Sequence, residues 1–333
     1  MNYHNGALLC CLLSGGSYAA GPDSLVETTE VLPESSWFLT TGEWLELKRD
    51  EFSETVNESA KGVDAYLARD LVDESLINDS YLRVRFKWRV EKSGYRKLEA
   101  NVRAKMQLPN AKRRWKITFD SNPDDFDSIS DRRRDQTSGS SSAQDLQDTA
   151  VAGISLDKYL GKNWDRNYNV GMKIRVPLDP YARASWTHTA EINEQWRSRF
   201  KETISYFDSE GWKTETSLDF YRPISDALLL QSSSAAQYID QDNNWEFFQS
   251  LSLHQRISVD TQFEHQVGVS GFSRPSLKTG GYWIRSELRH RLYKDWLYGK
   301  VSPELAFDRE SNFDLSPSIF FELEIFFGKA PKS

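Results

Sequence analysis

Cysteine is almost missing from this chain of 333 residues: the two that occur, Cys10 and Cys11, are adjacent and lie close to the N-terminus. The rest of the chain therefore cannot form a disulfide, use a thiol in catalysis or bind a metal through cysteine. Beyond the N-terminus no apolar run approaches the ~18 residues that a transmembrane helix requires. Charge of one sign does not gather in blocks and the net charge is -7, which argues against a nucleic-acid-binding surface.

The composition is polar but rich in aromatic residues. Charged residues make up 27%, hydrophobic residues 38% and aromatic residues 13% of the chain. These values suit either a polar soluble protein or a β-barrel that encloses its polar side chains. The aromatic surplus favours the barrel, because such barrels carry aromatic girdles at both membrane interfaces.

Strict alternation between apolar and charged residues marks three segments in the first half of the chain. In Leu82–Val90 every even residue is apolar and every odd residue is cationic, and Leu98–Leu108 and Trp115–Phe119 alternate in the same way. Side chains on a strand alternate between faces with period two, so each segment has one apolar and one charged face. The pattern predicts β-strands.

Similar segments continue to the C-terminus, separated by short turn signals. With the three above they make fourteen strands, within a range of 12 to 16, and each is close to the ~9–11 residues of a tilted membrane crossing. We therefore predict an all-β fold, a transmembrane antiparallel up-and-down β-barrel over residues 79–328. A soluble β-sandwich is the alternative fold, because half-solvated sheets alternate too. The further predicted strands are 150–160, 166–176, 180–191, 195–208, 212–222, 226–238, 244–256, 257–270, 279–292, 295–308 and 315–327.

The N-terminus predicts export. Ala7–Leu13 is a short apolar core, and small residues follow up to Ala19 and Ala20, which is typical of a secretory signal peptide covering residues 1–20. Residues 21–78 are then a periplasmic segment, and residues 329–333 are a C-terminal tail.

Within the periplasmic segment, apolar residues recur every three or four positions from about Glu43 to Val72. This predicts a short amphipathic helix, with a possible break near Gly62. The helix could pack against one end of the barrel, plug its lumen or bind a periplasmic partner.

Loop lengths agree with the predicted topology. If both chain ends are periplasmic, the long polar segment 122–147 and the connection 271–276 fall outside, whereas the short turns 161–163 and 293–295 fall in the periplasm. Long outer loops and short periplasmic turns are the known asymmetry of such barrels.

The last predicted strand ends in Phe320–Phe327, with Gly328–Ser333 running past it. Together with the export signal and the alternating strands, this resembles a Gram-negative outer-membrane β-barrel protein. The segment Asn78–Arg83 and the Leu108–Pro109 turn are also similar to uncharacterised proteobacterial exported proteins. The resemblance implies insertion by the barrel-assembly machinery and contact with outer-membrane lipid and lipopolysaccharide.

If the apolar faces meet lipid, the charged faces line the lumen. We expect Glu322 and Glu324 of the last strand to meet the Arg83–Arg89 ladder of the first when the barrel closes. The expected basic lining is Arg83, Arg85, Lys87, Arg89, Arg103, Lys105, Lys116, Lys173, Arg175, Arg197 and Arg199. The expected acidic lining is Glu215, Asp219, Asp260, Glu264, Glu287, Glu304, Glu322 and Glu324.

Three functions remain open. The first is a porin-like passive channel for small polar or anionic solutes. The second is a non-conducting structural or adhesion barrel with a salt-bridged lumen. The third is a lipid-modifying enzyme using serine and histidine near the lipid interface.

No catalytic residue, cofactor or metal site is predicted, and an enzyme is the weaker hypothesis. Counting residues along the strands places the histidines on the apolar face, and the pair His254 and His265 is the one to inspect. The four histidines after the predicted signal peptide are His188, His254, His265 and His290.

Overall fold

The computed structural model describes residues 36–68, 79–92, 94–110, 114–123, 129, 150–159, 161 and 163–328. The chain divides into two compact units, Met1–Trp44 and Leu45–Ser333. The predicted signal peptide, the C-terminal tail and most of the 122–147 loop lie outside the described residues.

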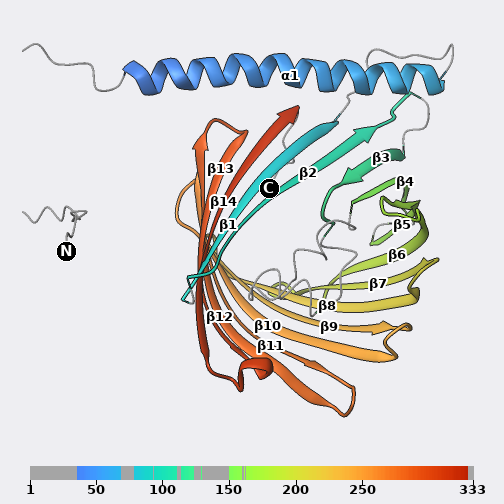
Figure 1. Cartoon of the computed structure of the whole chain (residues 1–333), viewed down its shortest axis with the longest axis vertical. Helices are drawn as coiled ribbons and strands as arrows, with labels where there is room; N and C mark the ends of the chain where they lie inside the picture. Colours follow the sequence, from blue (N-terminus) through green and yellow to red (C-terminus); the bar gives the residue numbers. More distant parts are fainter. Residues whose placement is uncertain are drawn as a thin grey trace, which may run out of the picture. The chain divides into compact units, whose positions relative to one another are not determined.

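The described residues of the second unit form one closed sheet of fourteen antiparallel strands in sequence order (Figure 1). The first seven are β1 (Tyr81–Glu91), β2 (Arg96–Gln107), β3 (Trp115–Asp120), β4 (Val151–Tyr159), β5 (Trp164–Lys173), β6 (Asp179–Glu191) and β7 (Arg197–Phe207). The others are β8 (Gly211–Ser225), β9 (Leu228–Ile239), β10 (Asn244–Arg256), β11 (Thr261–Phe272), β12 (Lys278–Tyr293), β13 (Leu297–Asp308) and β14 (Leu315–Gly328).

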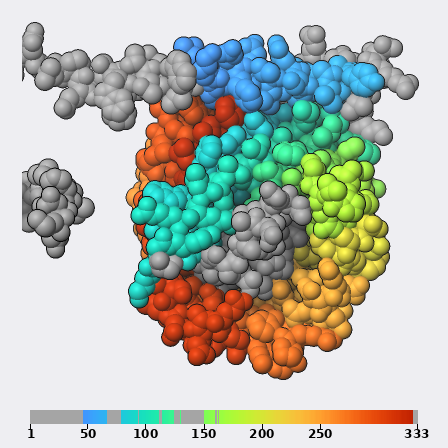
Figure 2. Space-filling view, in the orientation of Figure 1, coloured from blue at the N-terminus to red at the C-terminus, as the bar shows by residue number. Residues whose placement is uncertain are grey.

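The prediction of an up-and-down barrel with fourteen strands is confirmed. The barrel closes where β1 pairs with β14, from Tyr81 opposite Gly328 to Glu91 opposite Ser318. Figure 2 shows the first strands, in teal, directly beside the last strands, in red, on one face of the molecule. The β-sandwich alternative is wrong, because all fourteen strands belong to one sheet that has no free edge.

The two faces of the sheet differ in burial as well as in chemistry. Apolar side chains on one face remain exposed, such as Val170 at 56% and Ile284 at 51%, whereas carboxylates on the other face are covered, such as Glu304 at 1% and Glu324 at 4%. This inverts the arrangement of a soluble protein, in which charged side chains are rarely buried. The apolar face is therefore outward and the charged face inward.

Both ends of the barrel chain lie at one rim. Tyr81 begins β1 and Gly328 ends β14 opposite it, and the β12–β13 turn at Lys294 reaches the same end because consecutive strands run in opposite directions. We call this end the helix rim and the opposite end the far rim. The longest connection, between β3 and β4, and the β11–β12 connection are both at the far rim.

Helix α1 spans Ser36–Ala68. It begins before the predicted start and runs through Gly62 without interruption, so the structure has the unbroken one of the two alternatives. A glycine inside a helix costs only about 1 kcal/mol relative to alanine. Ala60 and Asp64, on either side of it, are 0% and 1% exposed, and their burial offsets that cost.

Candidate functional site

The strand register puts the predicted lining residues on the charged, inward face of the sheet, except Arg175 and Asp260, which lie outside the strands. The predicted charged positions on this face lie on ten of the fourteen strands or next to them. The basic positions lie on β1 (Arg83, Arg85, Lys87, Arg89), β2 (Arg103, Lys105), β3 (Lys116), β5 (Lys173), just after β5 (Arg175) and β7 (Arg197, Arg199). The acidic positions lie on β8 (Glu215, Asp219), in the β10–β11 turn (Asp260), on β11 (Glu264), β12 (Glu287), β13 (Glu304) and β14 (Glu322, Glu324).

The first and last strands meet as the sequence predicts. Arg85 lies opposite Glu324 and Lys87 lies opposite Glu322 in the β1–β14 register. Such cross-strand pairs of opposite charge stabilise a sheet by roughly 0.2–1 kcal/mol each. The seam that closes the barrel is thus held by charge as well as by backbone hydrogen bonds.

Glu324 is the centre of a cluster of cations at this seam. Its carboxylate lies 3.6 Å from Arg83 Nη1, 3.5 Å from Arg289 Nη2 and 3.8 Å from Lys300 Nζ. Lys300 also contacts Glu322 at 2.9 Å, and the Arg289 guanidinium stacks 4.2 Å from the centre of the Tyr298 ring. One buried carboxylate therefore faces three cations from β1, β12 and β13.

Two further predicted lining residues are paired in ways that the sequence analysis missed. Glu304 accepts hydrogen bonds from both Nε, at 2.7 Å, and Nη2 of Arg285. Arg103 Nε lies 2.5 Å from Asp120 Oδ2. Both acceptors are covered, Glu304 at 1% and Asp120 at 6% exposed.

Other predicted lining residues pair close to a rim. Lys173 contacts Glu210, which follows β7, at 2.5 Å. Arg175 contacts Asp179 at 2.9 Å. Asp260 lies in a turn rather than on a strand and pairs with Arg291. These residues therefore hold connections in place near the ends of the barrel.

The ion pairs of the barrel run along its wall. Among the described residues, the partners of each pair belong to one strand, to neighbouring strands or to segments at most two strands apart. The longest steps join Arg289 on β12 to Glu324 on β14, and Lys173 on β5 to the turn after β7. In a barrel of fourteen strands such pairs do not cross the interior.

Between Glu246 on β10 and Glu264 on β11, a neutral polar stretch lines the inward face of β9, β10 and β11. Gln231 Nε2 donates to Ser233 Oγ at 2.9 Å, and Gln266 Nε2 donates to Ser252 Oγ at 3.2 Å. The Trp283 indole N–H donates to Gln266 Oε1 at 3.2 Å. Amides and hydroxyls supply both donors and acceptors without net charge.

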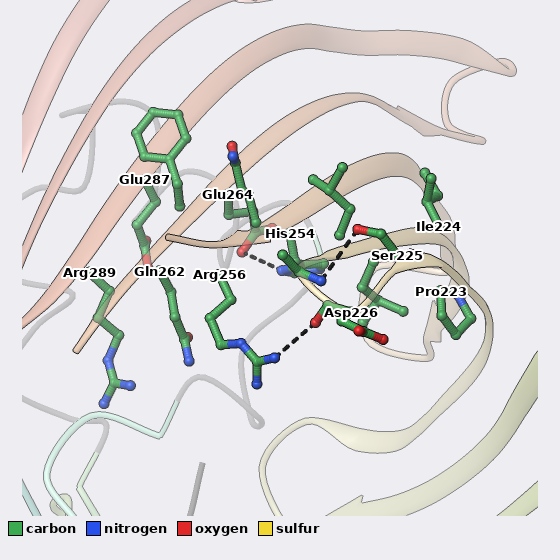
Figure 3. A pocket seen from close by; sticks show the side chains of 15 residues that line it. Pro223, Ile224, Ser225, Asp226, His254, Arg256, Gln262, Glu264, Glu287 and Arg289 are labelled. Atoms are coloured by element: carbon green, nitrogen blue, oxygen red, sulfur yellow. Dashed lines mark hydrogen bonds and ion pairs between the residues drawn. The ribbon is translucent and has the colours of Figure 1, made fainter. Parts of the chain in front are cut away.

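At the helix rim this neutral stretch opens into a cavity of about 640 Å³ (Figure 3). His254 lies in its wall, with Nε2 3.0 Å from Gln231 Oε1 and Nδ1 3.4 Å from Glu264 Oε2. Arg256 Nη2 donates to the Asp226 carbonyl at 2.9 Å. The cavity combines cationic and anionic groups with an apolar wall that includes Phe263.

The position of His254 corrects the sequence analysis, which placed it on the apolar face. His254 lies opposite Glu264 and faces inward, whereas His265 lies opposite Ser286 and faces outward. The pair singled out for inspection is therefore split between the two faces. His265 Nδ1 is 2.9 Å from Ser286 Oγ, and His290 Nδ1 is 2.8 Å from Thr261 Oγ1, both on the outward face.

The β3–β4 connection contacts the inward face at two of its described parts. Asn101 Nδ2 on β2 donates to the Asn122 carbonyl at 2.9 Å, and Pro123 is fully buried. Farther along, the Ile129 N–H donates to Gln237 Oε1 on β9 at 2.8 Å. The sequence analysis gave no signal for this contact, because it depends on closure of the barrel.

Helix α1 contacts the helix rim through residues from Glu46 onward. Arg49 donates from Nε to the Phe326 carbonyl at 3.1 Å and from Nη2 to the Gly328 carbonyl at 3.0 Å. The Phe52 and Phe327 rings meet edge to face at 5.1 Å. Near the other end of the helix the Asn110 N–H donates to the Asp64 carboxylate at 2.9 Å. Of the roles left open for the helix, these contacts match packing against a barrel end.

An ion pair between Glu46 and Lys294 holds the turn of helix α1 that contains Glu46 at the helix rim. Lys294 donates to Glu46, which lowers the pKa of that carboxyl below its usual 4.5 and raises the pKa of the lysine. Tyr293 Oη also donates to Glu46, at 3.0 Å. Since the carboxyl pKa is depressed, its contribution is present above the ordinary value and is lost as the pH falls through the lowered one.

Several partners in the inward network were missed although the sequence contains a signal for them. Lys300 has the same parity as Glu304, and Asp120 the same parity as Lys116, so counting by two along β13 and β3 would have found both. The acceptors Glu210 and Asp179 lie at strand ends, where period-two counting stops.

Within the described ranges no group of three or more histidine, cysteine or carboxylate side chains is placed to hold a metal ion. No helix in the described part of the chain is both long enough and apolar enough to cross a membrane.

A closed barrel of fourteen antiparallel strands, apolar outside and charged inside, is the architecture of Gram-negative outer-membrane β-barrel proteins. No family model and no curated protein matches the sequence. Solved structures that the chain is similar to include a loop-deletion mutant of OmpT, an outer membrane protein of Vibrio cholerae, at 8% identity, 75% of this chain, 99% of that chain and a TM-score of 0.46.

Two further similar structures are a bacterial polysaccharide outer membrane secretin and the KdgM porin in complex with disordered oligogalacturonate. The first is 12% identical over 75% of this chain and 99% of its own, with a TM-score of 0.45. The second is 6% identical over 74% of this chain and 98% of its own, with a TM-score of 0.37. All three likenesses concern the barrel fold alone.

Proposed function

We propose that this protein is a passive outer-membrane channel for small polar or anionic solutes. The observation that carries the proposal is the course of the ion pairs between described residues, which run along the wall. Partners that reached across the interior would close it with charged side chains, whereas partners on neighbouring strands leave room for water between opposite walls. Fixed charges on a water-filled wall attract and orient ions of opposite sign.

The preference for anions rests on the inward face of the first three strands. This face carries more cations than carboxylates, since only Glu91, Glu99 and Asp120 are acidic there. Its cations are Arg83, Arg85, Lys87, Arg89, Lys97, Arg103, Lys105 and Lys116. The neutral amides and hydroxyls of β9 to β11 would offer hydrogen bonds to uncharged polar solutes on the opposite side.

The proposal also assigns compartments to the two ends. Residues 1–20 would be removed as a signal peptide, residues 21–78 would be periplasmic, and the helix rim would face the periplasm. Outer-membrane lipid and lipopolysaccharide would surround the outward face, and the barrel-assembly machinery would insert it. N-terminal sequencing of the protein from outer membranes tests the cleavage site.

The alternative is a non-conducting structural barrel. The dense pairing around Glu324 and the Ile129–Gln237 contact favour it, because both fill the interior near the wall. A lipid-modifying enzyme has less support. The His265–Ser286 hydrogen bond lies on the outward face, but within the described part of the chain no carboxylate or amide hydrogen-bonds to His265 as well.

Conductance in planar bilayers separates the channel from the closed barrel. The purified protein is expected to give stepwise currents and, in a salt gradient, a reversal potential of the sign that marks preference for anions. The inward, exposed Arg197 gives a sharp variant: Arg197→Gln should shift the reversal potential towards zero, because it removes one fixed positive charge.

Ser198→Gln is the matched control, since Ser198 is the next residue on the same strand and faces outward. It should leave the reversal potential unchanged. Absence of current across a range of salts and voltages would reject the channel, and an equal shift in both variants would reject the assignment of Arg197 to the conducting path.

A further inference from the structure

A polar patch interrupts the apolar outward face of strands β7 to β10. The register shows that its members face outward: Glu202 lies opposite Thr216, and Ser234 lies opposite Gln249. We call this set the outer polar patch. Its members are Glu202, Thr214, Thr216, Ser232, Ser234 and Gln249.

The patch lies within the part of the wall that would face hydrocarbon. On each of the four strands the outward row starts at the far rim with an aromatic residue and continues beyond the patch with an apolar one. The aromatic residues are Tyr206, Trp212, Tyr238 and Trp245. The apolar residues are Phe200, Leu218, Leu230 and Leu251. Aromatic girdles mark the membrane interfaces, so the patch is below the interface.

Four members of the patch share one depth. Each is five positions from the far-rim end of its strand. Glu202 is counted from Phe207, Thr216 from Gly211, Ser234 from Ile239, and Gln249 from Asn244. At about 3.3 Å per residue and a tilt of about 40°, this depth is roughly 13 Å below the far rim. The four side chains therefore form a short belt around the barrel near the middle of the membrane.

Because the belt contains Glu202, its exposure to lipid would lower the stability of the barrel. Its carboxylate accepts hydrogen bonds from Thr214 Oγ1 at 2.8 Å and Thr216 Oγ1 at 2.5 Å, and within the described residues it has no cationic partner. A charged group on the lipid face of a barrel is destabilising, most strongly near the midplane. Covering the carboxylate with polar protein groups removes that penalty.

The belt is complementary to itself. A twofold axis parallel to the barrel and passing between β8 and β9 would bring Glu202 of one copy towards Gln249 of the other, and Thr216 towards Ser234, at equal depth. A carboxylate has about four acceptor sites and Glu202 uses two. The Gln249 amide nitrogen donates to Ser232 Oγ at 3.1 Å and, at a longer 3.4 Å, to the Ser250 carbonyl, and in the contact it would exchange this longer hydrogen bond for one to Glu202 of the other copy. In an isologous contact each such pair occurs twice.

Side-chain length in the belt also suits two convex surfaces. The short Thr216 and Ser234 are at the centre, where two barrels approach most closely, and the long Glu202 and Gln249 are at the flanks, where the gap widens. A groove of about 720 Å³ lies beside the centre and is lined by Leu218, Ala236 and Phe247, among others. A neighbouring wall could enter this groove.

We propose that the outward face of β7 to β10 is a contact between two parallel copies of this chain in the membrane. The belt of Glu202, Thr216, Ser234 and Gln249 forms its polar centre. The outward face of β1, which is apolar from Leu82 to Val90, remains in contact with lipid. This contact is independent of whether the barrel conducts.

Cysteine cross-linking in liposomes at a low protein-to-lipid ratio tests the contact. The background is the full chain with Cys10→Ser and Cys11→Ser, and Ser234→Cys places a thiol close to the twofold axis. Phe86→Cys is the matched control, because Phe86 faces outward on β1, five positions before the far-rim end at Glu91. Ser234→Cys should oxidise to a dimer of twice the mass, and Phe86→Cys should remain a monomer.

A second variant, Glu202→Leu, should weaken dimerisation about tenfold in native mass spectrometry, because the charged hydrogen-bonding flank is lost on both sides. Heat-modifiable gel mobility checks that each variant is a folded barrel. Equal cross-linking at both cysteine positions, cross-linking at neither, or an unchanged dimer in Glu202→Leu would overturn the proposal. Those results would leave the patch facing lipid or another protein.

Discussion

Glu324→Gln is expected to lower the free energy of unfolding by about 3 kcal/mol, because removing the negative charge from a buried cluster leaves its three cations with Glu322, on Lys300, as the remaining carboxylate of the cluster. Glu324 is 4% exposed, and its carboxylate lies within 4 Å of Arg83, Arg289 and Lys300. The glutamine keeps the shape of the side chain but removes its charge. The three cations then repel one another at the seam between β1 and β14, where the paired strands are not consecutive in the sequence.

Unfolding in urea, followed by tryptophan fluorescence in lipid vesicles, measures this loss. Glu194→Gln is the matched control, since Glu194 is an exposed carboxylate in the β6–β7 turn. Its unfolding free energy should stay within about 0.5 kcal/mol of the parent protein, as is usual for surface substitutions. Equal stability of the two variants would show that the seam is not held by the Glu324 cluster.

Gly268→Ala is expected to lower both stability and conductance. Gly268 faces inward on β11, directly beneath the Trp283 ring, and a Cβ there would overlap the indole. Trp283 is 3% exposed, packs 5.4 Å from Phe248 and donates to Gln266. An added methyl group must push the ring off the wall, at a cost of about 1–3 kcal/mol.

A ring displaced away from the wall moves towards the interior, so single-channel conductance should fall with stability. Gly62→Ala provides the contrast, because the space around Gly62 is open and it lies in helix α1. That variant should be about 0.5–1 kcal/mol more stable with unchanged conductance. Full stability and unaltered currents in Gly268→Ala would mean that Trp283 does not pack on the wall as described.

The fold could be predicted because period-two alternation is a property of the local sequence. The alternation in Leu82–Val90 alone defines an apolar face and a charged face of a strand. Similar segments, separated by turn signals every ten to fifteen residues, follow along the chain until the sheet closes. The meeting of Glu322 and Glu324 with the Arg83–Arg89 ladder followed from the same counting, because closure sets the last strand beside the first, and the structure adds the individual pairs Arg85–Glu324 and Lys87–Glu322.

The prediction failed where the contrast between the two faces is weak. On β10 the inward row contains Phe248 as well as Ser250 and Ser252, while the outward row contains Gln249. His254 was therefore assigned to the wrong face. The outer polar patch lies in the same region. Its polar side chains face outward, and they are the ones that weaken the alternation between apolar and polar residues there.

Ion-pair partners could be predicted only where the register was already known. Arg285 reaches Glu304 because the β12–β13 turn brings residues 19 apart into line, and Lys173 reaches Glu210 across two strands. Turn lengths and side-chain reach decide such contacts, and neither can be read from alternation. The continuity of α1 through Gly62 likewise depends on contacts with the barrel, such as that of Asp64 with Asn110.

The transmembrane barrel and the proposed channel both require that hydrocarbon meets one face of this sheet and water meets the other. Spin labels on single cysteines at neighbouring positions, Val84 with Arg85 and Val267 with Gln266, test this directly in reconstituted bilayers. We expect oxygen to relax the labels at Val84 and Val267, and a water-soluble nickel complex to relax those at Arg85 and Gln266. Inward labels that neither reagent reaches, or outward labels that the nickel complex reaches, would contradict the account.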